Sequence, residues 1–228
     1  PIGSVKSRSW VGSTDVRQGV TFNSVAEKVV TASLIEDLRM DALHEDDIAK
    51  ALAELKARCD ELGVPFAVIG ALALRRHGYR RFTEDIDIVT TREGLDRIHE
   101  RLVGRGIRPR WPGLRKKLRD TVHRVDINVI QAGEHAGSPE SPVVYPPPQS
   151  DAFTADTADG VPYAALVALI GFKIGSGIWG NRPRDLVDVQ ELIKANGLDE
   201  TFAAVLLEPL REAFIERVRA SRREIDIE

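Results

Sequence analysis

The stretch GYRRFTEDIDIVT (residues 78–90) places two carboxylates inside a segment that otherwise has the pattern of a buried strand. Asp85 and Asp87 alternate with isoleucines. Because side chains at positions i and i+2 of a strand project from the same face, roughly 7 Å apart, the two carboxylates lie side by side. Buried carboxylates are costly unless they are paired or hold a metal ion. The stretch therefore predicts either a metal site or ion pairs with the preceding Arg80 and Arg81.

The segments around this strand alternate between helix and strand. Apolar residues recur at helical spacing over about 44–62, and Gly63 stops that helix. The alternation of helices and strands indicates an α/β (α+β) fold, in which a mixed sheet is flanked by helices and followed by a helical C-terminal part. The expected strands are 64–69, 85–90, two short segments after residue 106, and 122–130. The expected helices after the first are 71–77, 91–103, 162–175, 183–195 and 199–221.

These elements divide the chain into three expected parts. Residues 1–40 read as an N-terminal extension that is separate from the core, because the first clear helix follows Met40. Residues 41–150 contain the expected sheet, and residues 151–228 are the helical region packed on it. The proline-rich run at 138–150 is a linker or a strap across the surface.

Composition narrows the class of protein. Hydrophobic residues make up 43% of the chain and charged residues 29%, which is ordinary for a globular domain. No stretch approaches the roughly 20 apolar residues that a membrane span needs, and the N-terminus lacks the apolar region of a secretory signal. The single cysteine, Cys59, excludes an intrachain disulfide and fits a reducing compartment. We therefore expect a cytoplasmic protein that does not contact a membrane.

Two further positions interrupt apolar strands. Gly70 ends the strand at 64–69, and a glycine there lets a phosphate approach free N–H groups of the backbone, although packing alone also produces such junctions. Asp126 interrupts the strand at 122–130 and is expected to share a face with Arg124 and Asn128. From the residues alone, Asp126 is either part of a site or one half of a structural ion pair.

Together these motifs resemble the DNA polymerase beta nucleotidyltransferase superfamily. The match reads Ile69-Gly70-Ala71, thirteen residues, then Asp85 and Asp87 on a strand. The segment HGYRRFTEDIDI looks like the version found in AbiEii-type nucleotidyltransferases, a group that includes abortive-infection and MenT-like toxins. Ala71 departs from the pattern, because a glycine or a small polar residue usually follows the glycine. The side-chain hydroxyl is therefore missing, while the backbone donors remain.

The resemblance continues to about residue 195. Lys173 ends an apolar helical run, and an R-D-x-x-D segment then opens another helix, as in the AbiEii-type group. Arg124-Val125-Asp126 stands where the group often has K-x-D. From the residues alone, Lys173 could also extend its ammonium group to solvent, Asp185 could stabilise a helix N-terminus, and Asp188 reads as structural.

The resemblance implies a set of site residues. A divalent cation, Mg²⁺ or Mn²⁺, is expected on Asp85, Asp87 and Asp126. Lys173 and Asp185 complete the expected catalytic set. The residues expected to bind a nucleoside triphosphate (NTP) are Gly70, Ala71, Arg81, Thr83, Arg124, Lys173, Arg182 and Arg184.

A basic segment lies between residues 101 and 124. It has nine Lys and Arg residues against one acid, Asp120, in a chain whose net charge is −3. Trp111 lies within it and could stack on a base. Such a segment fits a phosphate-rich partner such as RNA, although a solvated hairpin has the same composition.

The leading hypothesis is metal-dependent transfer of a nucleoside monophosphate (NMP) from an NTP to an acceptor hydroxyl, with release of pyrophosphate. RNA, and tRNA in particular, is the first expected acceptor. One alternative is a catalytically weak module of the same fold that binds nucleotide or RNA. Another is one half of a toxin–antitoxin pair whose main function is binding an antitoxin protein.

Overall fold

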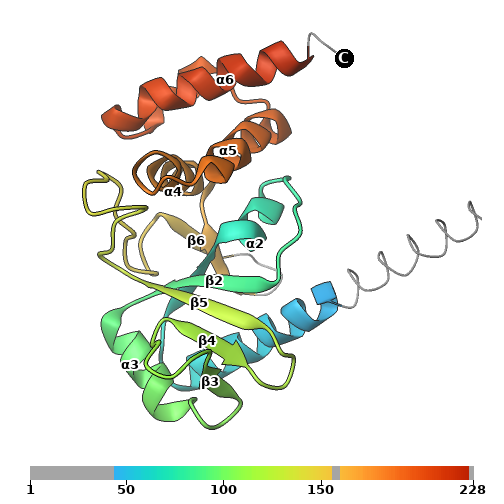
Figure 1. Cartoon of the computed structure of the whole chain (residues 1–228), viewed down its shortest axis with the longest axis vertical. Coiled ribbons are helices and arrows are strands. Elements are labelled where there is room, and N and C mark those ends of the chain that lie inside the picture. Colours follow the sequence, from blue (N-terminus) through green and yellow to red (C-terminus); the bar gives the residue numbers. More distant parts are fainter. Residues whose placement is uncertain (1–43, 156–159, 226–228) are drawn as a thin grey trace, which may run out of the picture. The chain divides into compact units, whose positions relative to one another are not determined.

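The computed structural model describes residues 44–155 and 160–225, so the expected N-terminal extension lies outside the described residues. The described residues contain one mixed seven-stranded sheet with the order β3-β4-β5-β2-β1-β7-β6, flanked by helices (Figure 1). The predicted fold class is confirmed. The strands are β1 (Phe66–Ile69), β2 (Asp85–Thr90), β3 (Ile107–Pro109), β4 (Lys117–Asp120), β5 (Asp126–Gln131), β6 (Phe153–Ala155) and β7 (Pro162–Ala164).

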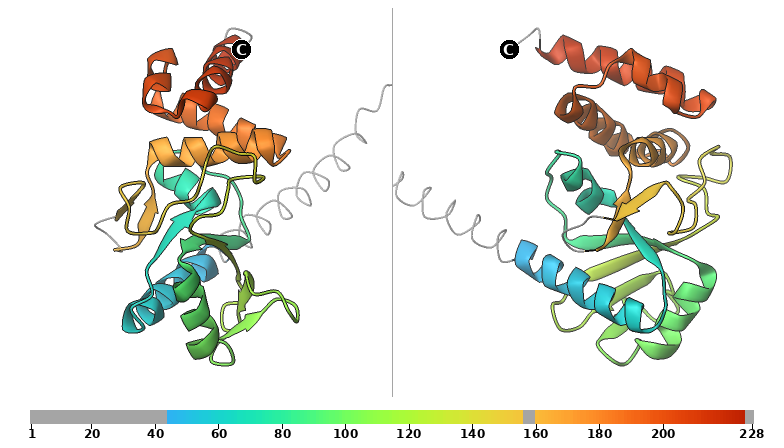
Figure 2. Two further views of the ribbon diagram at one scale, coloured as in Figure 1. Left: turned by 90° about the vertical axis from the view of Figure 1, so that its left-hand side faces the viewer. Right: turned by 180° about the vertical axis from the view of Figure 1, so that it is seen from behind.

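Helices lie on both sides of the sheet. A first helix over residues 44–61 and α3 (Arg92–Arg101) lie behind the strands in Figure 1 and in front of them in the reverse view of Figure 2. The other helices are α2 (Gly70–Arg76), α4 (Leu166–Trp179), α5 (Pro183–Asn196) and α6 (Arg211–Ile225). Of these, α4, α5 and α6 are stacked in succession beyond the opposite side (Figure 2). None of the helices in the described residues is long and apolar enough to cross a membrane.

The central position of β2 in the sheet explains why its aspartates alternate with isoleucines. β2 pairs antiparallel with β1 and parallel with β5. Ile86 and Ile88 are completely buried on one face of β2, as their alternation predicts. The register places Asp85 beside Asp126 and Asp87 beside Asn128 on the other face. The sheet therefore collects polar side chains from two neighbouring strands on one side.

Three sequence predictions need correction. The strand predicted at 122–130 begins only at Asp126, because residues 121–125 form the turn after β4 and Arg124 has a φ of 59°. Arg124 therefore does not share a strand face with Asp126. The helix predicted at 162–175 begins at Leu166, because residues 162–164 form β7 in a hairpin with β6. The helix predicted at 199–221 is two short 3₁₀ helices, Glu200–Val205 and Glu208–Leu210, followed by α6.

Candidate active site

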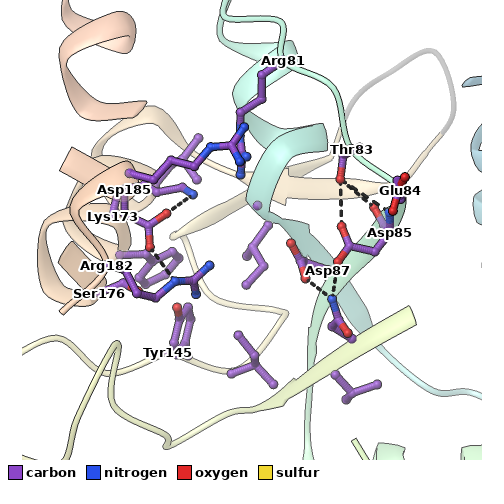
Figure 3. A pocket seen from close by; sticks show the side chains of 18 of the residues that line it. Arg81, Thr83, Glu84, Asp85, Asp87, Tyr145, Lys173, Ser176, Arg182 and Asp185 are labelled. Atoms are coloured by element: carbon purple, nitrogen blue, oxygen red, sulfur yellow. Dashed lines mark hydrogen bonds and ion pairs between the residues drawn. The ribbon is translucent and has the colours of Figure 1, made fainter. Parts of the chain in front are cut away.

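The two carboxylates of β2 converge on a single amide of β5. Asn128 Nδ2 donates hydrogen bonds to Asp85 Oδ2 at 2.6 Å and to Asp87 Oδ1 at 2.8 Å. Thr83 Oγ1 donates to Asp85 Oδ1 at 2.8 Å, and Lys117 Nζ donates to Asn128 Oδ1 at 2.7 Å. These contacts aim both carboxylates at the same space (Figure 3). We refer to Asp85 and Asp87 as the carboxylate pair.

Gly70 fits directly against this pair. It has a φ of 66°, in the left-handed region that favours glycine, and it begins α2. A Cβ atom at this position would lie 2.1 Å from Asp87 Oδ2, so the carboxylate occupies the space that a side chain would need. Ala71, the next residue, is buried, with 5% of its surface exposed. The glycine of the motif therefore allows α2 to approach the carboxylate pair.

The environment of Asp87 penalises its negative charge. Burial and the neighbouring Asp85 raise the pKa of Asp87 above its ordinary value, and the hydrogen bond from Asn128 and the charges of Lys173 and Lys117 offset only part of that increase. Asp87 therefore lacks part of the positive charge that its ionised form requires. Arg80 does not supply it, because it pairs with Glu45, and Arg81 faces Asp188.

The opposite wall of the site is a buried ion network on α4 and α5. Lys173 Nζ lies 2.6 Å from Asp185 Oδ1 and 2.7 Å from Asp188 Oδ2. Their exposed fractions are 7% for Lys173, 3% for Asp185 and 1% for Asp188. Two arginines approach from the edges: Arg182 Nε lies 3.3 Å from Asp185 Oδ2, and Arg81 Nε lies 3.4 Å from Asp188 Oδ1. We refer to these five residues as the lysine network.

The network holds Asp185 in its ionised form. Burial raises the pKa of Asp185, but the Lys173 charge and hydrogen bond, the Ser176 hydroxyl and the Arg182 charge outweigh burial and lower that pKa below its ordinary value. The Lys173 ammonium group is therefore occupied by two carboxylates rather than extended to solvent. Pro183 opens α5, as predicted, and Asp185 lies in its first turn.

The carboxylate pair and the lysine network face each other across one cavity of about 520 Å³. Figure 3 shows Thr83, Asp85 and Asp87 on one side and Lys173, Ser176, Arg182 and Asp185 on the other, with Tyr145 below Arg182. The lining is strongly charged. Its cationic residues are Arg81, Lys117, Lys173, Arg182 and Arg184, and its acidic residues are Glu84, Asp85, Asp87 and Asp185.

The structure brings together most of the predicted site residues. Those that line the cavity are Gly70, Arg81, Thr83, Asp85, Asp87, Lys173, Arg182, Arg184 and Asp185. Ala71, Arg124 and Asp126 do not line it. Arg124 is exposed in the turn before β5. Asp126 lies beside Asp85 in the sheet, but its carboxylate pairs with Arg110 and with Arg119, whose Nη1 is 2.7 Å from Asp126 Oδ1.

Sequence reasoning missed five polar residues of the cavity: Glu84, Lys117, Asn128, Tyr145 and Ser176. Asn128 carried a usable signal, because it follows Asp126 by two residues and so shares its strand face. Lys117 carried none, because it meets Asn128 only through the pairing of β4 with β5. Ser176 lies one helical turn after Lys173, also a detectable spacing. Tyr145 carried none: it belongs to the proline-rich segment, which the structure shows as a strap whose Val143 and Tyr145 are buried.

A divalent cation fits the carboxylate pair by its chemistry. The two convergent carboxylates, of which Asp87 has its pKa raised by burial and by Asp85, are hard oxygen ligands of the kind that Mg²⁺ prefers. Within residues 44–155 and 160–225, no three or more His, Cys, Asp or Glu side chains form a group that could hold a metal ion. The carboxylate pair thus offers two carboxylate ligands, which matches a cation completed by water and substrate oxygens.

Comparison with known proteins places the chain in a family. The model of the family described as "Nucleotidyl transferase AbiEii toxin, Type IV TA system" matches residues 50–227. Two solved structures of ANT(2″)-Ia are similar in fold. The crystal structure with adenylyl-2″-tobramycin has a TM-score of 0.44 and 18% identity, covering 74% of this chain and 97% of the other. The solution structure has a TM-score of 0.43 and 16% identity, covering 82% and 96%. No curated protein matches significantly. The chain belongs to the AbiEii nucleotidyl transferase toxin family of type IV toxin–antitoxin systems.

Proposed function

We propose that the cavity transfers an NMP group from an NTP to a hydroxyl group of RNA. The observation that carries this proposal is the arrangement of charges in one cavity. Two carboxylates of β2 converge on the Asn128 amide of β5, and five cationic side chains line the same cavity. A triphosphate with a bound cation complements both walls, because the cation satisfies the carboxylates while the remaining phosphate charge meets the basic groups.

Asp85 and Asp87 would hold Mg²⁺ or Mn²⁺. A cation there supplies charge neutralisation and polarisation of the phosphate oxygens. Asn128 keeps both carboxylates in place through its two hydrogen bonds, and Gly70 leaves room for Asp87. These two residues act on the chemistry through the carboxylates, by fixing their positions before substrate binds.

The basic residues have different roles in this proposal. Arg184 and Arg182 lie on the exposed rim of the cavity and can move to bind phosphate oxygens. Lys173 is buried between Asp185 and Asp188, so its first role is to hold the α4–α5 wall together. Its ammonium group still faces the cavity and adds positive charge near the triphosphate.

In the proposed reaction, an acceptor hydroxyl oxygen bonds to the α-phosphorus while the bond from that phosphorus to the bridging oxygen breaks. Pyrophosphate leaves with the electrons of that bond. The hydroxyl proton passes to a carboxylate, for which Asp126 is the candidate because it lies beside Asp85 in the sheet. This role requires Asp126 to separate from Arg110 and Arg119.

RNA is the proposed acceptor because the basic segment at 101–124 is the strongest concentration of positive charge in the chain. An antitoxin protein is a further proposed partner, which the family description supports.

Two measurements test the proposal. Calorimetry with each NTP should detect binding that requires Mg²⁺, and incubation with a labelled NTP and total cellular RNA should label RNA. The Asp85→Asn and Asp87→Asn variants should lose both. NTP binding that depends on Mg²⁺ without labelling of RNA or protein would instead support a binding module without transferase activity. Labelled protein with unlabelled RNA would remove RNA as the acceptor.

A further inference from the structure

We propose that the open face of β3, β4 and β5 binds a single-stranded end of the acceptor RNA and guides it into the cavity. This inference rests on the proposed function, because it names where the acceptor of that reaction binds. We call this surface the acceptor face. It consists of Arg108, Arg110, Trp111, Lys117 and Arg119.

The sheet register builds the acceptor face as two rows of side chains. Residues paired across neighbouring strands project from the same face. The first row runs across β3, β4, β5 and β2 as Arg108, Arg119, Asp126 and Asp85. The second row runs across β4, β5 and β2 as Lys117, Asn128 and Asp87, and the backbone N–H of Arg110 bonds to Lys117 at its outer end. Each row begins with cations at the sheet edge and ends at the carboxylate pair.

The acceptor face is open and continuous with the cavity. Arg108, Arg110 and Lys117 are exposed, and α3 and the helix over residues 44–61 lie on the opposite side of the sheet. Lys117 belongs to both surfaces, since it lines the cavity and also bonds to Asn128. A chain of phosphates on the rows would therefore lead directly to the carboxylate pair.

Trp111 gives the acceptor face a group that fits nucleic acid bases. It follows Arg110 in the β3–β4 hairpin, and 62% of its surface is exposed. Proteins that bind single-stranded nucleic acid combine a basic track for the backbone with aromatic side chains on which bases stack. An acidic peptide would satisfy the cations but would leave the indole without a planar partner. The combination therefore favours RNA over an acidic protein.

Binding of phosphate here also frees Asp126. Arg110 and Arg119 now pair with the Asp126 carboxylate, which keeps that group occupied although it lies beside Asp85. An incoming phosphodiester competes for the same two guanidinium groups. Once they bind phosphate, Asp126 can turn to the acceptor hydroxyl. Acceptor binding would thus complete the proposed site.

The binding test uses a fluorescent single-stranded 12-nucleotide RNA of mixed sequence, without NTP, at several salt concentrations. Trp111→Ala should weaken binding by about five- to 150-fold, the effect of losing one stacked base, while Trp111→Phe keeps most of the affinity. Arg108→Gln should reduce the slope of log K against log [salt] by about 0.7, the value for one lost phosphate contact on a single strand. Trp111→Ala should leave that slope unchanged.

The matched control is Arg92→Gln, which removes an exposed arginine of α3 on the opposite side of the sheet and should change neither affinity nor slope. Equal losses in Arg92→Gln and Arg108→Gln would overturn the proposal, as would wild-type affinity in Trp111→Ala. In turnover, Arg108→Gln and Trp111→Ala should raise KM for RNA and leave KM for the NTP unchanged, because neither residue lines the cavity. The binding test contains no NTP, so it measures RNA binding whether or not the protein transfers a nucleotide. A failure of the acceptor face in this test can therefore be distinguished from a failure of the proposed transferase activity.

Discussion

Replacing Lys173 by methionine should destabilise the protein strongly at neutral pH. Methionine fills a similar volume but leaves Asp185 and Asp188 buried without the ammonium group that lies 2.6 and 2.7 Å from them. Removing one partner of a buried ion pair costs about 3–5 kcal/mol of unfolding free energy. Arg81 and Arg182 lie farther away, at 3.4 and 3.3 Å, and compensate only partly.

The expected loss can be converted into a melting temperature. For a protein of this size, about 1 kcal/mol corresponds to about 2–4 °C, so Lys173→Met should melt about 6–20 °C below the wild type. Urea unfolding with an unchanged m-value would confirm that both proteins unfold from the same structure. Because two like-charged carboxylates remain, adding Asp188→Asn to Lys173→Met should recover part of the loss.

The difference in stability between the wild type and Lys173→Met should depend on pH. In the wild type, the lysine network lowers the pKa of Asp185, so its stabilisation is present above the unfolded pKa of about 3.9 and disappears as the pH falls through the lower folded value. In Lys173→Met, burial dominates and protonation relieves the penalty. The stability difference should therefore narrow below about pH 4. A variant within about 1 kcal/mol of the wild type at pH 7, or a gap that does not depend on pH, would refute the reasoning.

Three further predictions concern single residues. Gly70→Ala should abolish transfer, because its Cβ would lie 2.1 Å from Asp87 Oδ2. The control is Gly104→Ala, which also has a positive φ but has open space around its Cβ; it should lose about 1 kcal/mol of stability and keep transfer activity. Asp87→Asn should stabilise the metal-free protein at pH 7, because the raised pKa of Asp87 means that its ionised form is disfavoured in the folded state. Mg²⁺ at ten times its Kd should raise the unfolding free energy of the wild type by about 1.4 kcal/mol and leave that of the variant unchanged. Cys59, whose pKa burial raises to about 12, should react with a thiol reagent at pH 8 only after unfolding in urea.

The sequence predicted the centre of the fold because local patterns determine it. Alternation of Asp85 and Asp87 with buried isoleucines gave both the bounds of β2 and the face of the carboxylates. The helical spacing over 44–62 likewise gave the first helix, and Cys59 on that helix is completely buried. These predictions depend only on the periodicity of one strand or helix.

The parts that sequence did not predict depend on long-range pairing or on turns. β6 and β7 have three residues each, too few for a periodic pattern. Arg124 continued the alternation of β5 in sequence, but its positive φ places it in a turn. The ion pairs of Asp126 with Arg110 and Arg119 arise because β3, β4 and β5 are adjacent. The alternative of an ion pair for Asp126 describes the observed contacts, while its catalytic role stays a prediction.

The most direct test of the account compares the position of the label in the NTP. Purified protein is incubated with RNA and Mg²⁺ and with an NTP that is labelled either on its α-phosphate or on its γ-phosphate. We predict that RNA acquires the α-label and not the γ-label, and that Asp85→Asn and Asp87→Asn transfer neither. Transfer of the γ-label, or α-labelling that persists in either variant, would contradict the assignment of the carboxylate pair as the centre of nucleotidyl transfer.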